Sequence, residues 1–203
     1  MKGSAYTLFY AAALGSVCAL LLTAAASFTA PYKEANAEAE EARNILLALK
    51  VPLPEKATAA EVLKIREENV QEKMRGDITT YAYSPASEGG KTLAVAMRFS
   101  GPGLWGRIKG FLALEPDMKT IRGITFYEQE ETPGLGGEIV KSWFRDQFVG
   151  KMIVGQDGKP GIIIKIGGQA APNKVDGISG ATLTCDKVQA MLTEAAKSIV
   201  EEK

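Results

Sequence analysis

The stretch Thr92-Leu-Ala-Val-Ala-Met-Arg-Phe99 indicates the fold class of this chain. Larger apolar side chains stand at every second position, at Leu93, Val95, Met97 and Phe99. This period of two predicts a β-strand, because successive side chains of a strand point to opposite faces of a sheet. A turn-rich segment at 84–90 precedes the strand.

Further elements follow on the C-terminal side. We expect strands at Ile108–Leu114 and Ile121–Tyr127, a helix around Glu138–Phe148 and a short strand at 162–164. A last helix is predicted from one apolar face, which consists of Val188, Met191, Leu192, Ala195, Ala196 and Ile199. Since neighbouring strands come first and helices lie around them, the sequence predicts an α+β fold. We expect a mostly antiparallel sheet with flanking helices, preceded by one N-terminal transmembrane helix.

The N-terminal residues 1–32 are predicted to form a membrane anchor. No charged residue lies between Lys2 and Lys33, and the stretch Ala5–Phe28 is long enough to cross a bilayer as a helix, which needs ~20 residues. A cleaved signal peptide is the alternative, although its apolar region spans only ~7–15 residues. Because the Lys2 side is positive and the other flank is acidic on balance, we expect a single-pass protein of the bacterial inner membrane. Its N-terminus would be cytoplasmic and its soluble domain periplasmic.

Residues 33–90 are predicted to be a helical lead-in and connector. Pro31 is expected to end the membrane helix. A helical spacing then recurs at Ala39, Ala42, Leu46 and Leu49. The sequence Thr-Ala-Ala-Glu at 58–61 has the form of a capping box and opens a second predicted helix towards Lys73. The remaining residues, 91–203, would form the functional domain.

The composition excludes several classes of function. The 203 residues include no histidine, so catalysis by imidazole and histidine-ligated metal sites are ruled out. Two cysteines cannot form a four-cysteine zinc site or iron–sulfur cluster within the chain. Because 24 basic residues balance 24 acidic ones, nucleic-acid binding is not expected. We predict neither a metal site nor a catalytic side chain.

The segment Gly101-Pro-Gly-Leu-Trp-Gly106 matches the G-x-G-x-x-G pattern of dinucleotide-binding proteins. The residues after Gly106 read as a strand rather than an amphipathic helix, so no helix N-terminus would receive a pyrophosphate. We therefore interpret the segment as a tight turn between strands, with Trp105 packed beside it.

Two later segments are candidates for binding a ligand. In Glu131-Thr-Pro-Gly-Leu-Gly-Gly-Glu138, the glycines let the backbone approach a flat ligand, and Leu135 offers an apolar face. In Asp176-Gly-Ile-Ser-Gly-Ala-Thr-Leu-Thr184, small residues and hydroxyls precede the last helix, whose N-terminus favours an anion such as phosphate. From the residues alone, a plain loop and ordinary helix capping remain open as alternatives.

The second segment carries a specific resemblance. Residues Asp176 to Thr182 match the motif Dxx[ST]GAT, on which a bacterial flavin transferase esterifies FMN to the final threonine. With the segments 101–116, 123–128 and 131–138, the chain resembles the family of C subunits of the Na⁺-translocating NADH:quinone reductases, whose members bind FMN covalently. The resemblance includes the N-terminal span and is weakest over 34–90. Cys185 departs from the pattern, because a serine is expected there, and it would place a thiol near the flavin.

The resemblance implies a membrane-anchored electron carrier with FMN bound to Thr182 as a phosphodiester, and with no separate substrate site. Around this threonine, the implied cofactor-binding residues are Ser179, Gly180, Ala181, Leu183 and Thr184, with Ser179 and Thr184 as hydroxyl donors to the phosphate. Thr132, Gly134 and Leu135 would approach the isoalloxazine ring, and Asp176 would be recognised by the flavin transferase. The implied partners are other subunits of a membrane redox complex, the transferase during maturation, and the lipid bilayer.

Two other functions remain open. The G subunit of the Rnf ferredoxin:NAD⁺ oxidoreductase resembles this chain in its anchor, flavin motif and Pro-Gly-Leu-Gly turn, whereas Gly-Pro-Gly-Leu-Trp and Phe-Leu-Ala-Leu-Glu-Pro favour the quinone reductase. A membrane-anchored, non-redox adaptor could also use the same helix terminus to bind an anion or a partner protein. A covalent flavin would distinguish the redox carriers from the adaptor.

Overall fold

The computed structural model describes residues 2–76, 78–167 and 171–201 of the chain. It divides into two compact units, Met1–Ala39 and Glu40–Lys203. The helix α1 (Lys2–Ala48) contributes to both of them.

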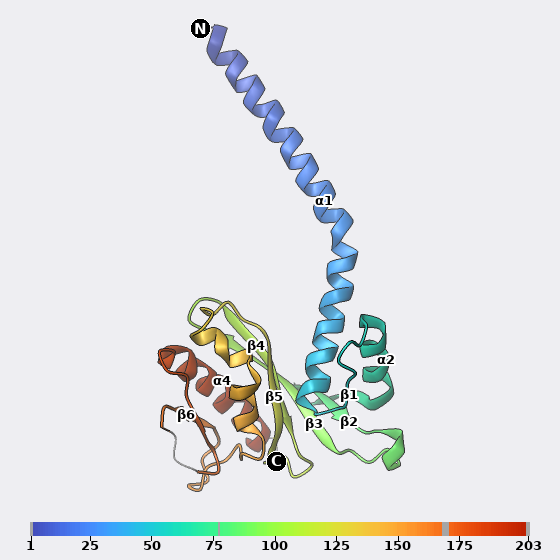
Figure 1. Cartoon of the computed structure of the whole chain (residues 1–203), viewed down its shortest axis with the longest axis vertical. Helices are drawn as coiled ribbons and strands as arrows, with labels where there is room; N and C mark the ends of the chain where they lie inside the picture. The colour runs from blue at the N-terminus through green and yellow to red at the C-terminus, as the bar shows by residue number, and fades with distance from the viewer. Residues whose placement is uncertain (1, 77, 168–170, 202–203) are drawn as a thin grey trace. The chain divides into compact units, whose positions relative to one another are not determined.

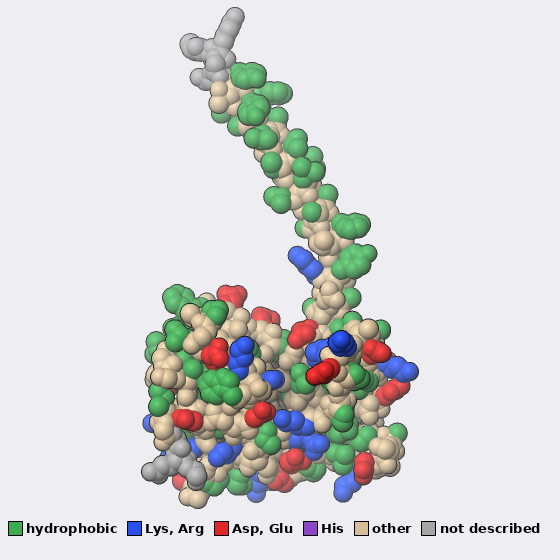
Figure 2. Space-filling view, viewed as in Figure 1, with side chains coloured by type: hydrophobic (Ala, Val, Ile, Leu, Met, Phe, Trp, Pro, Cys, Tyr) green, Lys and Arg blue, Asp and Glu red, His purple; other side chains and the backbone are tan. Residues whose placement is uncertain are grey.

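The N-terminal unit is the first part of α1, and exposed hydrophobic side chains lie along it between Tyr6 and Tyr32 (Figure 2). Within the described residues, α1 is the one helix long and apolar enough to cross a membrane, and it fits a single-pass anchor. The prediction that Pro31 ends this helix is wrong, because α1 continues through it. Pro31 removes one backbone donor, whereas the alanine- and glutamate-rich stretch after it has high helix propensity.

The C-terminal unit is built on a five-stranded antiparallel sheet with the strand order β1-β2-β3-β4-β5. Its strands are β1 (Val70–Arg75), β2 (Ile78–Tyr83), β3 (Ala94–Pro102), β4 (Arg107–Leu114) and β5 (Ile121–Glu128). A separate parallel pair consists of β6 (Ile163–Lys165) and β7 (Lys174–Asp176). The predicted α+β fold with a mostly antiparallel sheet is confirmed, and β3 to β6 lie close to their predicted positions.

The prediction for 33–90 missed two strands. The capping box is present, since the Thr58 hydroxyl accepts from the Glu61 N–H and Glu61 accepts from the Thr58 N–H, but α2 (Ala59–Asn69) ends four residues before Lys73. The chain then enters β1, and β2 pairs with both β1 and β3. Only Val70 of β1 is buried, so no alternation of apolar residues marks this strand in the sequence.

The helices on the C-terminal side are short until the last one. The helix predicted around Glu138–Phe148 is instead a succession of three short elements, η2 (Gly136–Val140), α3 (Ser142–Arg145) and η3 (Asp146–Phe148). Another 3₁₀ turn, η1 (Ala86–Glu88), precedes β3. The predicted last helix is present as α4 (Thr182–Glu201), with its apolar face against the sheet.

The strands β3 to β5 are mostly buried, and both faces of the sheet there are covered. The end of α1 and α2 cover the first face, where the strands present small residues such as Ala96 and Ala113. A Cβ on Gly123 would overlap the carbonyl oxygen of Ala48, so glycine is required for this close approach. On the second face α4 packs on large side chains that include Met97, Phe99, Leu112, Ile124 and Phe126. Figure 1 shows α4 and α2 on opposite sides of the sheet.

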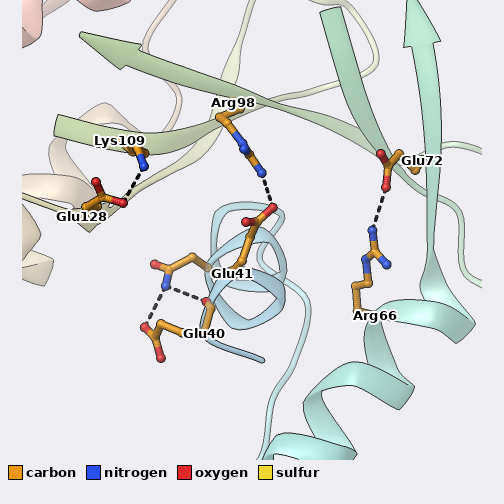
Figure 3. A network of polar contacts seen from close by, with 8 residues as sticks. Glu40, Glu41, Arg66, Glu72, Arg98, Lys109 and Glu128 are labelled. Atoms are coloured by element: carbon orange, nitrogen blue, oxygen red, sulfur yellow. Dashed lines mark hydrogen bonds and ion pairs between the residues drawn. The ribbon is translucent and has the colours of Figure 1, made fainter. Parts of the chain in front are cut away.

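Polar contacts surround the first face. Figure 3 shows the ion pair between Arg98 of β3 and Glu41 of α1, and the pair between Arg66 and Glu72. Between the sheet and α1, Thr125 Oγ1 of β5 donates to the Asn44 carbonyl at 3.2 Å. Since partly exposed ion pairs contribute only ~0–1 kcal/mol each, most of the stability of this face comes from its buried apolar side chains.

Candidate functional site

Three segments that lie far apart in the sequence form one groove in the C-terminal unit. They are the turn between β3 and β4, the loop after β5, and the start of α4. The residues that line the groove are Leu104, Trp105, Glu131, Thr132, Leu135, Gly136, Gly180, Ala181, Thr182, Leu183 and Thr184. The glycine-rich loop and the hydroxyl-rich segment identified in the sequence are therefore brought together.

The start of α4 presents Thr182 to this groove. Gly180 has a φ of +78°, which is the left-handed conformation that favours glycine. The Ala181 N–H donates to the Ile178 carbonyl at 3.1 Å, and Thr182, the first residue of α4, is exposed. Because the N–H groups of a first helical turn have no acceptor four residues earlier, this end of α4 favours a negatively charged group.

The loop after β5 supplies an apolar surface beside Thr182. Its turn is closed by hydrogen bonds from Leu135 N and Gly137 N to the Thr132 carbonyl, at 3.1 and 3.0 Å. A Cβ on Gly180 would lie 3.0 Å from Leu135 Cδ2, so the glycine allows the loop and the α4 start to meet. Leu135 keeps 42% of its surface exposed. The groove thus combines an apolar side chain with the backbone donors of a helix start.

The turn between β3 and β4 forms another side of the groove. The Gly103 N–H donates to the Gly106 carbonyl at 2.7 Å, and β4 follows directly. The interpretation as a tight turn between strands, rather than a dinucleotide-binding loop, is confirmed. Leu104 and Trp105 nevertheless line the groove, and Trp105 is 70% exposed rather than packed. Sequence reasoning missed this role because the two residues reach the groove only through the strand pairing.

Glu131 is a further residue that sequence reasoning missed. Its side chain is buried, and Oε1 accepts from Leu104 N at 2.8 Å and from Trp105 N at 3.2 Å. Oε2 accepts from Thr184 Oγ1 at 2.5 Å. The only signal in the sequence was its place at the start of the glycine-rich loop. Nothing in the sequence indicated its partners, which lie 26, 27 and 53 residues away.

The predicted binding residues do not all face the groove. Seven of them line it: Thr132, Leu135, Gly180, Ala181, Thr182, Leu183 and Thr184. Ser179 and Gly134 are exposed but are not among the lining residues. Thr184, predicted to donate to a phosphate, is buried in the first turn of α4, and its hydroxyl donates to Glu131 in the structure.

Asp176 and Cys185 also lie away from the groove. Asp176 is exposed at the end of β7, where its Oδ1 accepts from Gly167 N at 2.8 Å. Cys185 is turned into the core, and its Sγ accepts from Ile178 N at 3.4 Å. Burial raises the pKa of this thiol above its ordinary value. Cys185 therefore does not line the groove, because the helical position after Thr184 faces the sheet.

No group of three or more histidine, cysteine, aspartate or glutamate residues in the described part of the chain is placed to hold a metal ion. The groove consists instead of apolar side chains, backbone donors and hydroxyls. This set of groups suits a flat, partly apolar ligand with an anionic end.

Comparison with known proteins points to a flavin-binding family. Residues 103–197 match the family model of the FMN-binding domain, and this range contains every residue that lines the groove. The chain is 45% identical over 109 residues to the C subunit of the Na(+)-translocating NADH-quinone reductase of Yersinia pestis. The chain resembles this C subunit. The resemblance predicted from the motifs is confirmed.

The match to these relatives is partial. The alignment with the Yersinia pestis protein covers 53% of this chain and 41% of the relative. The corresponding protein of Vibrio campbellii is 40% identical over 132 residues, which are 64% of this chain and 51% of the relative. The chain thus spans about half the length of these curated relatives, or less.

Solved structures agree with the sequence matches. The crystal structure of the C subunit of the same reductase from Parabacteroides distasonis superimposes with a TM-score of 0.71 at 26% identity. The superposition covers 84% of this chain and 94% of that one. The structural likeness therefore extends well beyond residues 103–197.

Proposed function

We propose that this chain is a membrane-anchored electron carrier that holds FMN through a phosphoester to Thr182, as a subunit of a Na⁺-translocating NADH:quinone reductase. The observation that carries the proposal is the exposed threonine of the Asp-x-x-Ser-Gly-Ala-Thr motif, which starts α4 and lines a groove with an apolar wall. The match to the FMN-binding domain and the resemblance to the reductase C subunits support the choice of cofactor.

The residues of the groove fit the two ends of FMN. The N–H groups in the first turn of α4 would hold the remaining negative charge of the phosphodiester. Leu104, Trp105 and Leu135 would form the surface against the isoalloxazine ring, which is flat and partly apolar. When bound, FMN supplies the ability to accept and release electrons one or two at a time.

The other predicted residues have separate proposed roles. Thr132 and Gly134 would set the backbone of the loop that approaches the ring. Ser179 would be a further donor near the phosphate, and the exposed Asp176 would be accessible to the flavin transferase during maturation. Since the Thr184 hydroxyl donates a hydrogen bond to Glu131, we propose that Thr184 holds the first turn of α4 in place rather than binding the phosphate.

The proposed setting follows from the anchor and the relatives. The apolar part of α1 would hold the protein in the inner membrane as a single pass, with its N-terminus in the cytoplasm and the flavin domain on the periplasmic side. Neighbouring redox subunits would exchange electrons with the flavin. The matches to quinone reductase proteins favour this assignment over the Rnf complex and over a non-redox adaptor.

The decisive experiment is in-gel flavin fluorescence of the denatured full-length chain after expression with a flavin transferase. We expect a fluorescent band for the wild type and none for Thr182→Ala, because only a covalent flavin survives denaturation. Thr184→Ala and Ser179→Ala are the matched controls within the same motif, and both should keep the band. A wild type without the band, or a band that survives Thr182→Ala, would overturn the proposal.

A further inference from the structure

Glu131 is a buried acidic residue that lines the groove and is hydrogen-bonded to the other two segments that form it. Only 4% of its surface is exposed, although the residues 132–135 that follow it are exposed. Its two carboxylate oxygens accept three hydrogen bonds, at 2.8, 3.2 and 2.5 Å, from Leu104 N, Trp105 N and Thr184 Oγ1. A buried carboxylate of this kind is costly unless donors compensate it, and here all three donors come from other groove segments.

Two glycines leave the space that this carboxylate occupies. A Cβ on Gly103 would lie 2.5 Å from Oε1, and a Cβ on Gly136 would lie 2.8 Å from Oε2. The Cβ on Gly136 would also overlap Thr184 Oγ1. Neither glycine has a left-handed φ, so backbone conformation does not explain them. Their small size admits the Glu131 side chain, and at Gly103 it also leaves room for the Gly106 carbonyl oxygen, which would lie 2.7 Å from a Cβ.

The hydrogen bonds join the three sides of the groove. Glu131 belongs to the loop of Leu135, its Oε1 binds the turn of Leu104 and Trp105, and its Oε2 binds the first turn of α4. Thr184 lies two residues after the proposed attachment site, Thr182, within the same helical turn. The Glu131 side chain therefore links that turn to the segments that form the apolar wall.

We infer that Glu131 is a positioning residue for the flavin: it fixes the turn that bears Thr182 against the wall formed by Leu104, Trp105 and Leu135. The inference rests on the proposed function. It assigns Glu131 no part in forming the phosphoester. Loss of the Glu131 carboxylate should therefore make the isoalloxazine ring more mobile without preventing attachment of FMN to Thr182.

The test compares Glu131→Ala and Glu131→Gln in the full-length chain, matured with a flavin transferase. Flavin fluorescence anisotropy and visible circular dichroism report how firmly the ring is held, and in-gel fluorescence reports loading. We expect Glu131→Ala to lower the flavin anisotropy and the visible circular dichroism, while in-gel fluorescence shows the same flavin loading as in the wild type. Glu131→Gln should retain most of them, because an amide can accept from the two backbone N–H groups and donate to Thr184 Oγ1.

Either of two results would overturn the inference: wild-type anisotropy and dichroism in a fully loaded Glu131→Ala, or equal losses in the alanine and glutamine variants. A wild type that carries no flavin would instead refute the proposed function. The two failures are thus distinguishable.

A second variant keeps the test valid if Glu131→Ala does not fold. Thr184→Val removes one donor to Glu131 and preserves the side-chain shape. Thr193→Val is its matched control, since Thr193 Oγ1 donates to the Gln189 carbonyl in the same helix, at 2.8 Å. We expect a smaller fall in anisotropy for Thr184→Val than for a loss of the whole carboxylate, and none for Thr193→Val. Equal anisotropy in the two valine variants would contradict the inference.

Discussion

The two faces of the five-stranded sheet differ in how they are packed and in what they carry. Small residues such as Ala96 and Gly123 let the end of α1 lie close to the first face. Large residues such as Phe99 and Leu112 support α4 on the second face, and the groove begins at the start of that helix. The family match at 103–197 includes most of α4 but neither α1 nor α2. Both faces are packed as cores, but we expect the site to depend more on the second face than on the first.

The largest effect on stability should come from removing a fully buried leucine on either face. Leu46 on the first face and Leu192 on the second each have 0% exposure. Leu46→Ala and Leu192→Ala should each lower the free energy of unfolding by about 2–5 kcal/mol, because each leaves a cavity. Urea unfolding of the full-length chain in detergent measures this loss.

The same pair tests whether the two faces have separate roles. Leu192→Ala should also lower the flavin anisotropy, because it loosens the packing of the helix that bears Thr182. Leu46→Ala should leave the anisotropy unchanged under conditions where the protein remains folded. If both variants lower it equally, the division between a supporting face and a functional face is wrong.

An intermediate effect is expected from Gly123→Ala on the first face. The added Cβ would overlap the Ala48 carbonyl oxygen, which is backbone and cannot rotate away. We expect a destabilisation of about 1–3 kcal/mol, as is typical of overpacking, with full flavin loading. Thermal unfolding measures the destabilisation, and in-gel fluorescence measures the flavin loading. Gly134→Ala is a useful comparison, because a Cβ there meets no atom within 4 Å, although its φ of +77° disfavours alanine.

The smallest expected effect is the pH dependence of stability that comes from the buried thiol of Cys185. Burial raises the pKa of Cys185 above its ordinary value of 9.0, so the folded state keeps the thiol protonated where the unfolded state begins to ionise. The contribution of this thiol to stability is therefore full below about pH 9 and is lost as the pH rises through the folded pKa. The free energies of unfolding of the wild type and of Cys185→Ala can be measured from pH 7 to pH 10. We expect the difference between these two free energies to become modestly smaller as the pH rises. A constant difference would contradict it.

The sequence predicted those elements whose local pattern agrees with their tertiary environment. Met97 and Phe99 alternate because one face of β3 meets α4, and Val188 and Leu192 repeat because one face of α4 meets the sheet. The second helix was identified by its capping box, which depends only on neighbouring residues. Local patterns of this kind need no knowledge of the rest of the chain.

The elements that were missed have no such local pattern. Only Val70 of β1 is buried, and the pairing of β1 with β2 is specified by the sheet rather than by apolar alternation. The region 136–148 breaks into short turns, although its composition permits a helix. α1 continues through Pro31, where a local rule predicted an end.

By itself, the sequence determined the anchor-like N-terminal segment, the α+β class and the motif that ends at Thr182, because composition, periodicity and short motifs are local properties. Only the tertiary structure decided that Leu104 and Trp105 share a groove with Thr182, that Cys185 faces the core, and that Glu131 joins the sides of the groove. The reason is physical: these relations depend on strand pairing and helix packing between residues far apart in the chain, which no local pattern encodes.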